Sequence, residues 1–141
     1  MITFEITSGQ IRADGILLGT GYAGNGSALN NPLATDIKMH GPLPVGSYAI
    51  GFPQDRPTTG RFSLPLTPDS ANQMFGRSEF YIHGGLANEP CDSPSVTPAG
   101  QRTASDGCIV TAHDVRVAIS QDPDHLLHVV AVDPDVTPQV A

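Results

Sequence analysis

Glycine and proline interrupt this chain of 141 residues so often that long regular elements are excluded. The 15 Gly and 13 Pro are spread along its whole length. Together they make up about a fifth of the chain, which is above average usage but below the level typical of disorder. Short segments of alternating apolar and polar residues lie between them. This pattern predicts a mainly β domain with short strands and many turns.

The strands are predicted where apolar and β-branched residues alternate between turn signals. They cover residues 2–6, 11–13, 16–20, 47–52, 62–66, 80–83, 108–110 and 126–132. Asp14-Gly15 marks a hairpin turn between the second and third strands. Pro65 predicts that the strand over residues 62–66 lies at a sheet edge, because proline has no N–H for the ladder. Thr111 is the predicted N-cap of one short helix over residues 113–120.

Charge and hydropathy narrow the classes of function. The chain has 7 Lys and Arg against 14 Asp and Glu and contains no basic run, so we expect neither nucleic acid nor an anionic membrane as a partner. No apolar run approaches the ~18 residues of a membrane span. The first residues lack the features of a signal peptide, so we expect synthesis in the cytoplasm without one. We expect residues 1–141 to form a single domain with 133–141 as a loose tail.

The segment around Cys108 has the features of a nucleophile turn. Ser105, Asp106 and Gly107 precede Cys108, and a predicted strand follows and would anchor it. Gly107 leaves room for a substrate beside the sulfur, and the backbone N–H groups of this turn are candidates for an oxyanion hole. The alternatives are a buried thiol or a disulfide with Cys91, although the two cysteines lack CxxC spacing.

His83 is the candidate base. It ends the apolar strand over residues 80–83 and is followed by Gly84-Gly85, which leave space around the ring. A histidine beside a cysteine activates the thiol, and a third group must fix the ring tautomer. No acidic residue is close in the sequence, so the carbonyl just after His83 is the candidate for that group. The alternative is a structural, hydrogen-bonded histidine.

These motifs carry a family resemblance. Residues 80–85 (FYIHGG) followed by residues 105–109 (SDGCI) resemble the HG…S-x-G-C-[IV] signature of L,D-transpeptidases. Four upstream motifs resemble, in order, those of the type VI secretion L,D-transpeptidase effectors. They are GYAGNG at 21–26, NNP at 30–32, GPLPVGSY at 41–48 and GRSEF at 76–80. The resemblance covers about residues 19–116.

The resemblance implies a fold and a reaction. The fold is an L,D-transpeptidase-like β-sandwich or barrel with one short helix after the catalytic Cys. The Cys attacks the carbonyl before the terminal D-Ala of a peptidoglycan tetrapeptide stem, and the His protonates the leaving D-Ala. Water then resolves the acyl-enzyme as an L,D-carboxypeptidase, or an amine resolves it by transpeptidation or D-amino-acid exchange.

The setting is implied in the same way. An antibacterial toxin of this kind acts in the periplasm of a target bacterium after secretion. Its expected partners are peptidoglycan stem peptides, a cognate immunity protein and a component of the secretion system. No cofactor is expected.

The family motifs assign roles to individual positions. Cys108 is the nucleophile, His83 the general base and acid, and Gly84 supplies the carbonyl that orients the ring. Ser105 and Gly107 shape the turn.

Four further positions are candidates for binding substrate. Arg77 is suited to a substrate carboxylate, because a guanidinium holds one bidentately, and its alternative role is a structural ion pair. Tyr22, His40 and Asp106 are the other three candidates, placed there by the family motifs. No H-x₃₋₅-H or CxxC spacing is present, so no metal site is predicted.

Two departures from the common pattern weaken a direct transfer from housekeeping L,D-transpeptidases and fit the effector branch better. Asp106 stands where many L,D-transpeptidases have His, and Val110 where many have Arg. The span from His83 to Cys108 also contains an insert over residues 86–103 that holds Cys91 and is a candidate lid. The alternatives are a housekeeping cell-wall L,D-transpeptidase and a non-catalytic peptidoglycan-binding or phage structural module. A papain-like protease is disfavoured, because the order His then Cys is reversed relative to that family.

Overall fold

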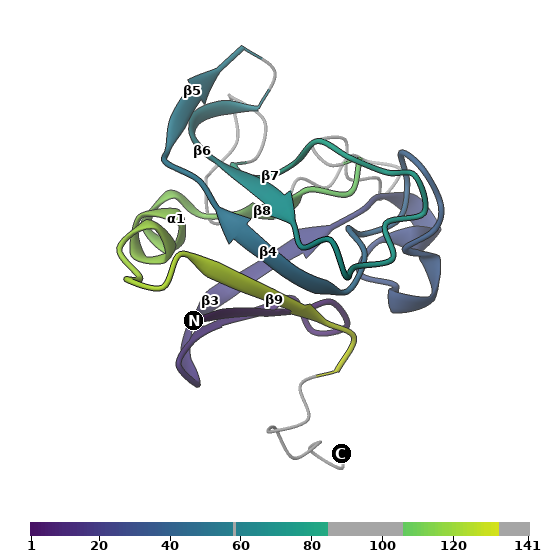
Figure 1. Ribbon diagram of the computed structural model, residues 1–141, viewed down its shortest axis with the longest axis horizontal. Helices are drawn as coiled ribbons and strands as arrows, with labels where there is room; N and C mark the ends of the chain where they lie inside the picture. Colours follow the sequence, from purple (N-terminus) through teal and green to yellow (C-terminus); the bar gives the residue numbers. More distant parts are fainter. Residues whose placement is uncertain (58, 85–105, 133–141) are drawn as a thin grey trace.

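The computed structural model describes residues 1–57, 59–84 and 106–132, which build a β-barrel with one α-helix (Figure 1). Strands make up 41% of the described residues and helices 13%, so the predicted mainly β fold class is confirmed. The strands are β1 (Ile2–Glu5), β2 (Gln10–Ala13), β3 (Ile16–Ala23), β4 (Gly46–Ile50), β5 (Gln54–Arg56), β6 (Gly60–Pro68), β7 (Phe80–His83), β8 (Ile109–Thr111) and β9 (Leu126–Val130). Two 3₁₀ segments, η1 (Gly26–Ala28) and η2 (Pro32–Ala34), and the helix α1 (His113–Ser120) complete the elements.

Eight of these strands close into the barrel. Their order is β4-β9-β1-β2-β3-β8-β7-β6, and β6 pairs again with β4. The pairs β1–β9 and β7–β8 are parallel, and the other barrel pairs are antiparallel. β5 extends β6 into a hairpin that stands out at the top of Figure 1. Closure leaves the barrel strands without exposed edges, which protects them from pairing with other chains.

The barrel interior is filled by apolar side chains from alternate positions, because successive residues of a strand point to opposite faces. Phe4, Tyr48, Leu64 and Ile82 are at most 1% exposed and belong to one hydrophobic cluster. The alternation assigns the remaining positions of each strand to the outer face of the barrel. The candidate site lies at β7 and at the residue before β8.

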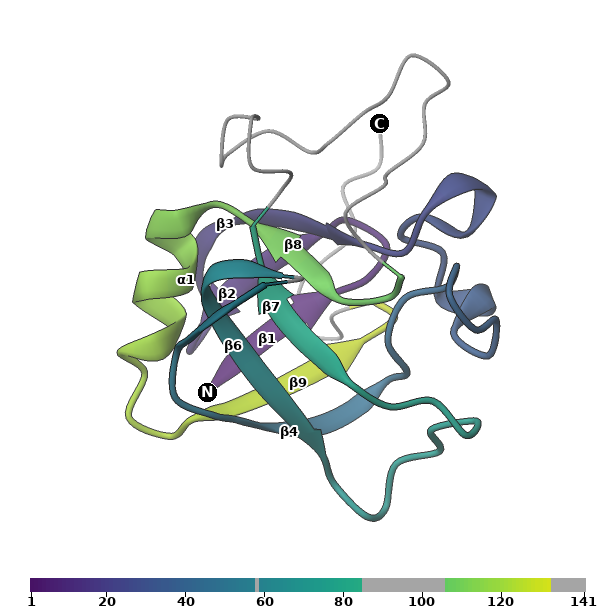
Figure 2. The ribbon, with the colours of Figure 1, turned by 90° about the horizontal axis from the view of Figure 1, so that it is seen from above.

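The two ends of the barrel differ. Helix α1 packs against β3 and β6 and adds Val115 and Ile119, one helical turn apart, to the core cluster. Figure 2 shows α1 at one end and the connections over residues 24–45 and 69–79 at the other. β7 and β8 both run from the loop end toward the helix end. Cys108, which directly precedes β8, therefore lies at the loop end.

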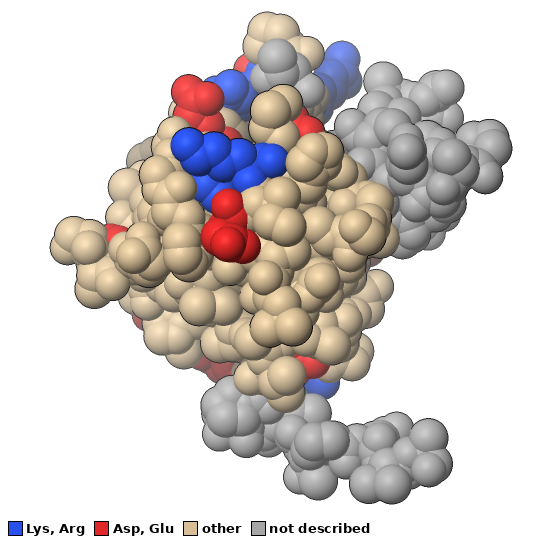
Figure 3. Space-filling view, turned by 90° about the vertical axis from the view of Figure 1, so that its right-hand side faces the viewer, with Lys and Arg blue, Asp and Glu red and all other residues tan. Residues whose placement is uncertain are grey.

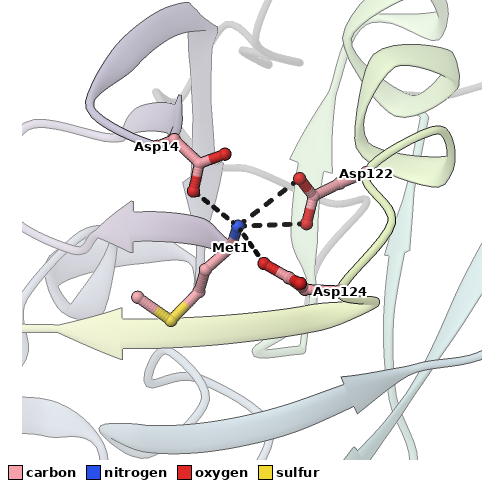
Figure 4. Close-up of polar contacts among 4 residues, drawn as sticks. All are labelled: Met1, Asp14, Asp122 and Asp124. Carbon is pink, nitrogen blue, oxygen red and sulfur yellow. Dashed lines mark hydrogen bonds and ion pairs between the residues drawn. The ribbon is translucent and has the colours of Figure 1, made fainter.

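The amino terminus of the chain is held at the helix end by carboxylates. The ammonium of Met1 lies 2.9 Å from Asp14, 3.2 Å from Asp122 and 3.0 Å from Asp124 (Figure 4). The hydrogen bonds that the ammonium donates, first to Asp14 and then to Asp124, raise its pKa to about 11. These contacts tie β1 to the β2–β3 turn and to the connection between α1 and β9.

The structure corrects the prediction that the Pro65 strand lies at an edge. β6 pairs with β7 along one side and with β5 and then β4 along the other. Pro65 stands opposite Tyr81, and its carbonyl accepts a hydrogen bond from the Gly51 N–H. A proline is tolerated at this position because it lacks only the N–H donor, while its carbonyl still accepts a hydrogen bond.

The predicted helix is present over His113–Ser120, but its N-cap is Ala112 and not Thr111. Thr111 is the last residue of β8, and its hydroxyl donates to the Thr20 carbonyl across the barrel wall. The cap prediction was wrong because the strand continues one residue further than expected. Within the described residues, no helix is long and apolar enough to span a membrane.

Candidate active site

Cys108 and His83 come from adjacent parallel strands. The β7–β8 register pairs Ile82 with Ile109 and His83 with Val110. Ile82 and Ile109 point into the core cluster, so the alternation puts His83 on the other face of β7, while Cys108 precedes β8 and packs against the edge of the core cluster. Extending the register by one residue makes them diagonal neighbours, with Cα atoms about 8 Å apart from the usual strand spacings. An imidazole and a thiol side chain together span such a distance.

The imidazole of His83 is held in one tautomer. His83 is 5% exposed, and its Nδ1 lies 2.7 Å from the Gly84 carbonyl. A carbonyl oxygen only accepts, so Nδ1 carries the proton and Nε2 keeps its lone pair. Burial, aided by the charge of Arg116, lowers the pKa of His83 below its usual value. The ring is therefore neutral at pH 7 and able to accept a proton.

The thiol of Cys108 is half-buried. The Tyr81 backbone N–H lies 3.4 Å from Sγ and donates to it. Burial raises the pKa of Cys108 to about 11, although the Tyr81 N–H acts in the opposite direction. The resting pair is thus a protonated thiol and a neutral imidazole, so the thiol must lose its proton during attack. Cys91 and the insert over residues 86–103 lie outside the described residues.

Arg77 anchors the turn that carries Cys108. Its guanidinium is 7% exposed and donates to the carbonyls of four residues at distances of 2.7 to 3.0 Å. These residues are Thr35, Gly41, Pro42 and Asp106. The guanidinium is therefore engaged by the chain itself, which argues against its predicted role as a receptor for a substrate carboxylate. Nor is the alternative of an ion pair observed, because the partners are neutral carbonyls.

Gly107 fits the same junction. Its φ of +129° is a conformation that L side chains rarely adopt, and a Cβ there would lie 2.5 Å from Arg77 Nη2 and 2.8 Å from the Gly41 carbonyl. The Gly107 carbonyl accepts a hydrogen bond of 3.0 Å from the Leu43 N–H. The GPLPVGSY motif thus supports the nucleophile turn, and Tyr48 holds it on β4 by donating to the Pro44 carbonyl at 2.6 Å.

Arg116 lies behind the histidine. It is 3% exposed, and its Nη1 donates to the Thr111 carbonyl at 2.7 Å. A Cβ on Gly84 would lie 2.6 Å from that same Nη1, so the glycine allows the guanidinium to approach the His83 end. The sequence analysis did not single out Arg116. Its place on the helix after the Cys strand gave no local signal of contact with Gly84.

The remaining predicted substrate-binding residues differ in placement. Tyr22 pairs with Val110, which also pairs with His83, so Tyr22 and His83 flank one residue of β8 across neighbouring strands. Tyr22 is buried. Burial is the main cause of the lowered pKa of His83 and the raised pKa of Cys108, and the exposed carboxylate of Asp106 acts on both groups in the raising direction.

His40 and Ser105 are less informative. His40 is exposed, and its Nδ1 lies 2.9 Å from the Asn25 side-chain oxygen in the loops at the barrel end. Ser105 lies outside the described residues, so the oxyanion-hole prediction that includes it stays a prediction.

In the part of the chain that the structure describes, no group of three or more His, Cys, Asp or Glu side chains is placed to hold a metal ion. Figure 3 shows Lys and Arg next to Asp and Glu on one face, rather than gathered into a basic patch. That face therefore lacks the electrostatic footprint of a nucleic-acid site.

The fold and the site define a small β-barrel domain with a thiol and a tautomer-fixed imidazole on neighbouring strands. A family model, the Tlde1 domain, matches residues 19–133, and the chain belongs to this family. The Tlde1 domain is a family of type VI secretion L,D-transpeptidase effectors, which agrees with the resemblance drawn from the motifs. Searches of curated proteins and of solved structures gave no match.

Proposed function

We propose that this protein is a cysteine acyl-transfer enzyme that removes or exchanges the terminal D-Ala of peptidoglycan tetrapeptide stems. The observation that carries the proposal is the His83 Nδ1–Gly84 carbonyl contact of 2.7 Å on the strand beside Cys108. It leaves the lone pair of Nε2 available to accept a proton. Membership in the Tlde1 domain family supports the same reaction class.

The reaction starts from the neutral pair. Nε2 of His83 accepts the thiol proton while Sγ of Cys108 attacks the carbonyl before the terminal D-Ala. The imidazolium then donates that proton to the D-Ala nitrogen, the C–N bond breaks, and free D-Ala leaves behind a thioester on Cys108. Water or an amine attacks the thioester, and His83 takes the proton of this nucleophile and returns it to the sulfur.

The two possible acceptors give two outcomes. Attack by water yields a tripeptide stem, which is L,D-carboxypeptidase activity. Attack by a free D-amino acid or by a second stem yields exchange or a cross-link.

The biological setting belongs to the same proposal. As an antibacterial type VI effector, the enzyme would reach the periplasm of a target bacterium, where the stem peptides lie. A cognate immunity protein would protect the producing cell. Survival of target cells that express the protein in their periplasm tests the toxin role, with Cys108→Ala as the matched control.

Product analysis tests the chemistry. Purified protein is incubated under reducing conditions with a defined disaccharide tetrapeptide, with and without an added D-amino acid. Mass spectrometry should show loss of D-Ala in the first case and replacement of D-Ala in the second. Cys108→Ala should give neither product. Binding of the muropeptide by the wild-type protein without any turnover would favour a non-catalytic module instead.

A further inference from the structure

A third arginine, Arg56, contacts a residue that borders the candidate site. It ends β5, in the hairpin that projects from the barrel (Figure 1). Its Nη1 donates to the Tyr81 hydroxyl at 2.6 Å, and its Cζ lies 4.0 Å from the centroid of the Tyr81 ring. A guanidinium over an aromatic ring is attracted to the ring face. Tyr81 thus fixes both the position and the direction of this cation.

Tyr81 also borders the nucleophile. Its backbone N–H donates to Cys108 Sγ at 3.4 Å, and its side chain lies on the same face of β7 as His83. The positive charge of Arg56 acts on the Cys108 thiol in the sense that favours its ionised form. Arg56 therefore places a cation within electrostatic range of the reacting sulfur.

Arg56 uses fewer of its N–H donors in hydrogen bonds with described residues than Arg77 does. A guanidinium has five N–H donors in a fixed fork. The two terminal nitrogens of Arg77 donate hydrogen bonds to four backbone carbonyls. Nη1 of Arg56 donates to the Tyr81 hydroxyl, and the buried Nε has no hydrogen-bond partner among the described residues. The three ion pairs of the described residues all belong to the terminal ammonium, so Arg56 has no carboxylate partner there.

A buried guanidinium N–H without a partner is unfavourable, and a carboxylate is the group whose geometry matches the fork. In the proposed reaction, the terminal carboxylate of the stem belongs to the residue directly after the attacked carbonyl. It must therefore lie beside the sulfur when Sγ is in position to attack.

We propose that Arg56, held by Tyr81, is the subsite for the terminal carboxylate of the stem peptide. This inference rests on the proposed function and names the group that selects the chain end. In the exchange reaction, the carboxylate of an incoming D-amino acid occupies the same subsite. Arg56 thus takes the role that the sequence suggested for Arg77.

Two substrates and two variants test the subsite. The substrates are a disaccharide tetrapeptide with a free terminal carboxylate and the same compound with a terminal carboxamide. Wild type should favour the free acid in kcat/KM by about 10- to 100-fold, the effect of one charge-assisted contact. Arg56→Met should lose this preference, because the fall on the free acid should exceed any fall on the carboxamide that follows from the lost charge near the thiol. Arg61→Met, a change of an exposed arginine on the same hairpin, should keep it.

A milder variant guards against misfolding of Arg56→Met. Tyr81→Phe keeps the ring and the backbone N–H but removes the hydroxyl that receives Nη1, and it should reduce the preference partly. Equal losses on both substrates in Arg56→Met would overturn the subsite, as would a wild type that hydrolyses acid and carboxamide equally well. Both results leave the proposed function standing. A wild type that turns over neither substrate would overturn the function and the subsite together.

Discussion

Two buried arginines lie next to the two reacting residues, and their hydrogen-bond partners lie at different distances along the sequence. Arg77 lies behind the Cys108 turn and joins carbonyls from η2, the GPLPVGSY motif and Asp106, which lie 29 to 42 residues away in the sequence. Arg116 lies behind His83, and its carbonyl partner Thr111 is five residues away.

The difference shows how one residue type serves two ends of a site. Arg77 acts mainly through hydrogen bonds that position three loops, so its removal should appear in stability and in the placement of the thiol. Arg116 also carries a charge that lowers the pKa of His83. Its removal should therefore appear in the pH dependence of the reaction.

The largest effect is expected from Arg77→Met. The substitution keeps much of the apolar stem but leaves several buried carbonyls without a donor, each of which is costly. We expect the free energy of unfolding to fall by about 3 kcal/mol or more. Urea denaturation measures this change. An unchanged denaturation midpoint would show that Arg77 is not the anchor of the turn.

A pair of glycine substitutions compares the two ends directly. Gly107→Ala introduces a Cβ at a φ of +129°, close to the Gly41 backbone. Gly84→Ala meets the end of the Arg116 side chain instead. Backbone strain should cost about 1–3 kcal/mol at Gly107 and less at Gly84, where the side chain has more freedom to shift. Thermal unfolding of both variants ranks them, and the reverse order would contradict the account.

Arg116→Met should move the acid limb of the kcat/KM profile. In the wild type, burial and then Arg116 hold the pKa of His83 below 6.5, so the ring stays neutral into mildly acidic solution. Without that positive charge, the pKa rises, more of the ring is imidazolium at a given acidic pH, and the acid limb shifts to higher pH. Rates well above the pKa should change less. An acid limb that does not move would exclude the electrostatic role.

The smallest effect is expected far from both arginines. Asp124→Asn removes one of the three carboxylates around the Met1 ammonium at the helix end. Exposed ion pairs contribute little, so the melting temperature should barely change and activity should be unaffected. A clear loss of activity would show that this end communicates with the site.

The local features of the fold and of the candidate site could be predicted from the sequence. The alternating segments and the HG and SxGC motifs pointed to a β domain with His83 before Cys108, and the carbonyl after His83 was expected to orient the ring. Each inference needs only a few neighbouring residues.

The parts that failed depend on contacts between distant segments. The edge-strand prediction for Pro65 used a local rule, whereas barrel closure gives β6 partners on both sides. Arg77 was expected to bind a carboxylate because its carbonyl partners come from loops whose approach has no local signal. The closeness of Arg56 to the thiol likewise follows from the β6–β7 register and the hairpin, which motifs do not encode.

Trapping the acyl-enzyme tests the central claim most directly. The protein is mixed with a carbapenem. The thiol attacks the carbonyl of the β-lactam ring, the ring C–N bond breaks, and the resulting thioester has the full mass of the probe. Intact-mass measurement and peptide mapping then locate the adduct. The account predicts one adduct per chain, on Cys108 and not on Cys91, absent in Cys108→Ala and formed far more slowly in His83→Ala. An adduct on Cys91, no adduct at all, or an unchanged rate in His83→Ala would contradict it.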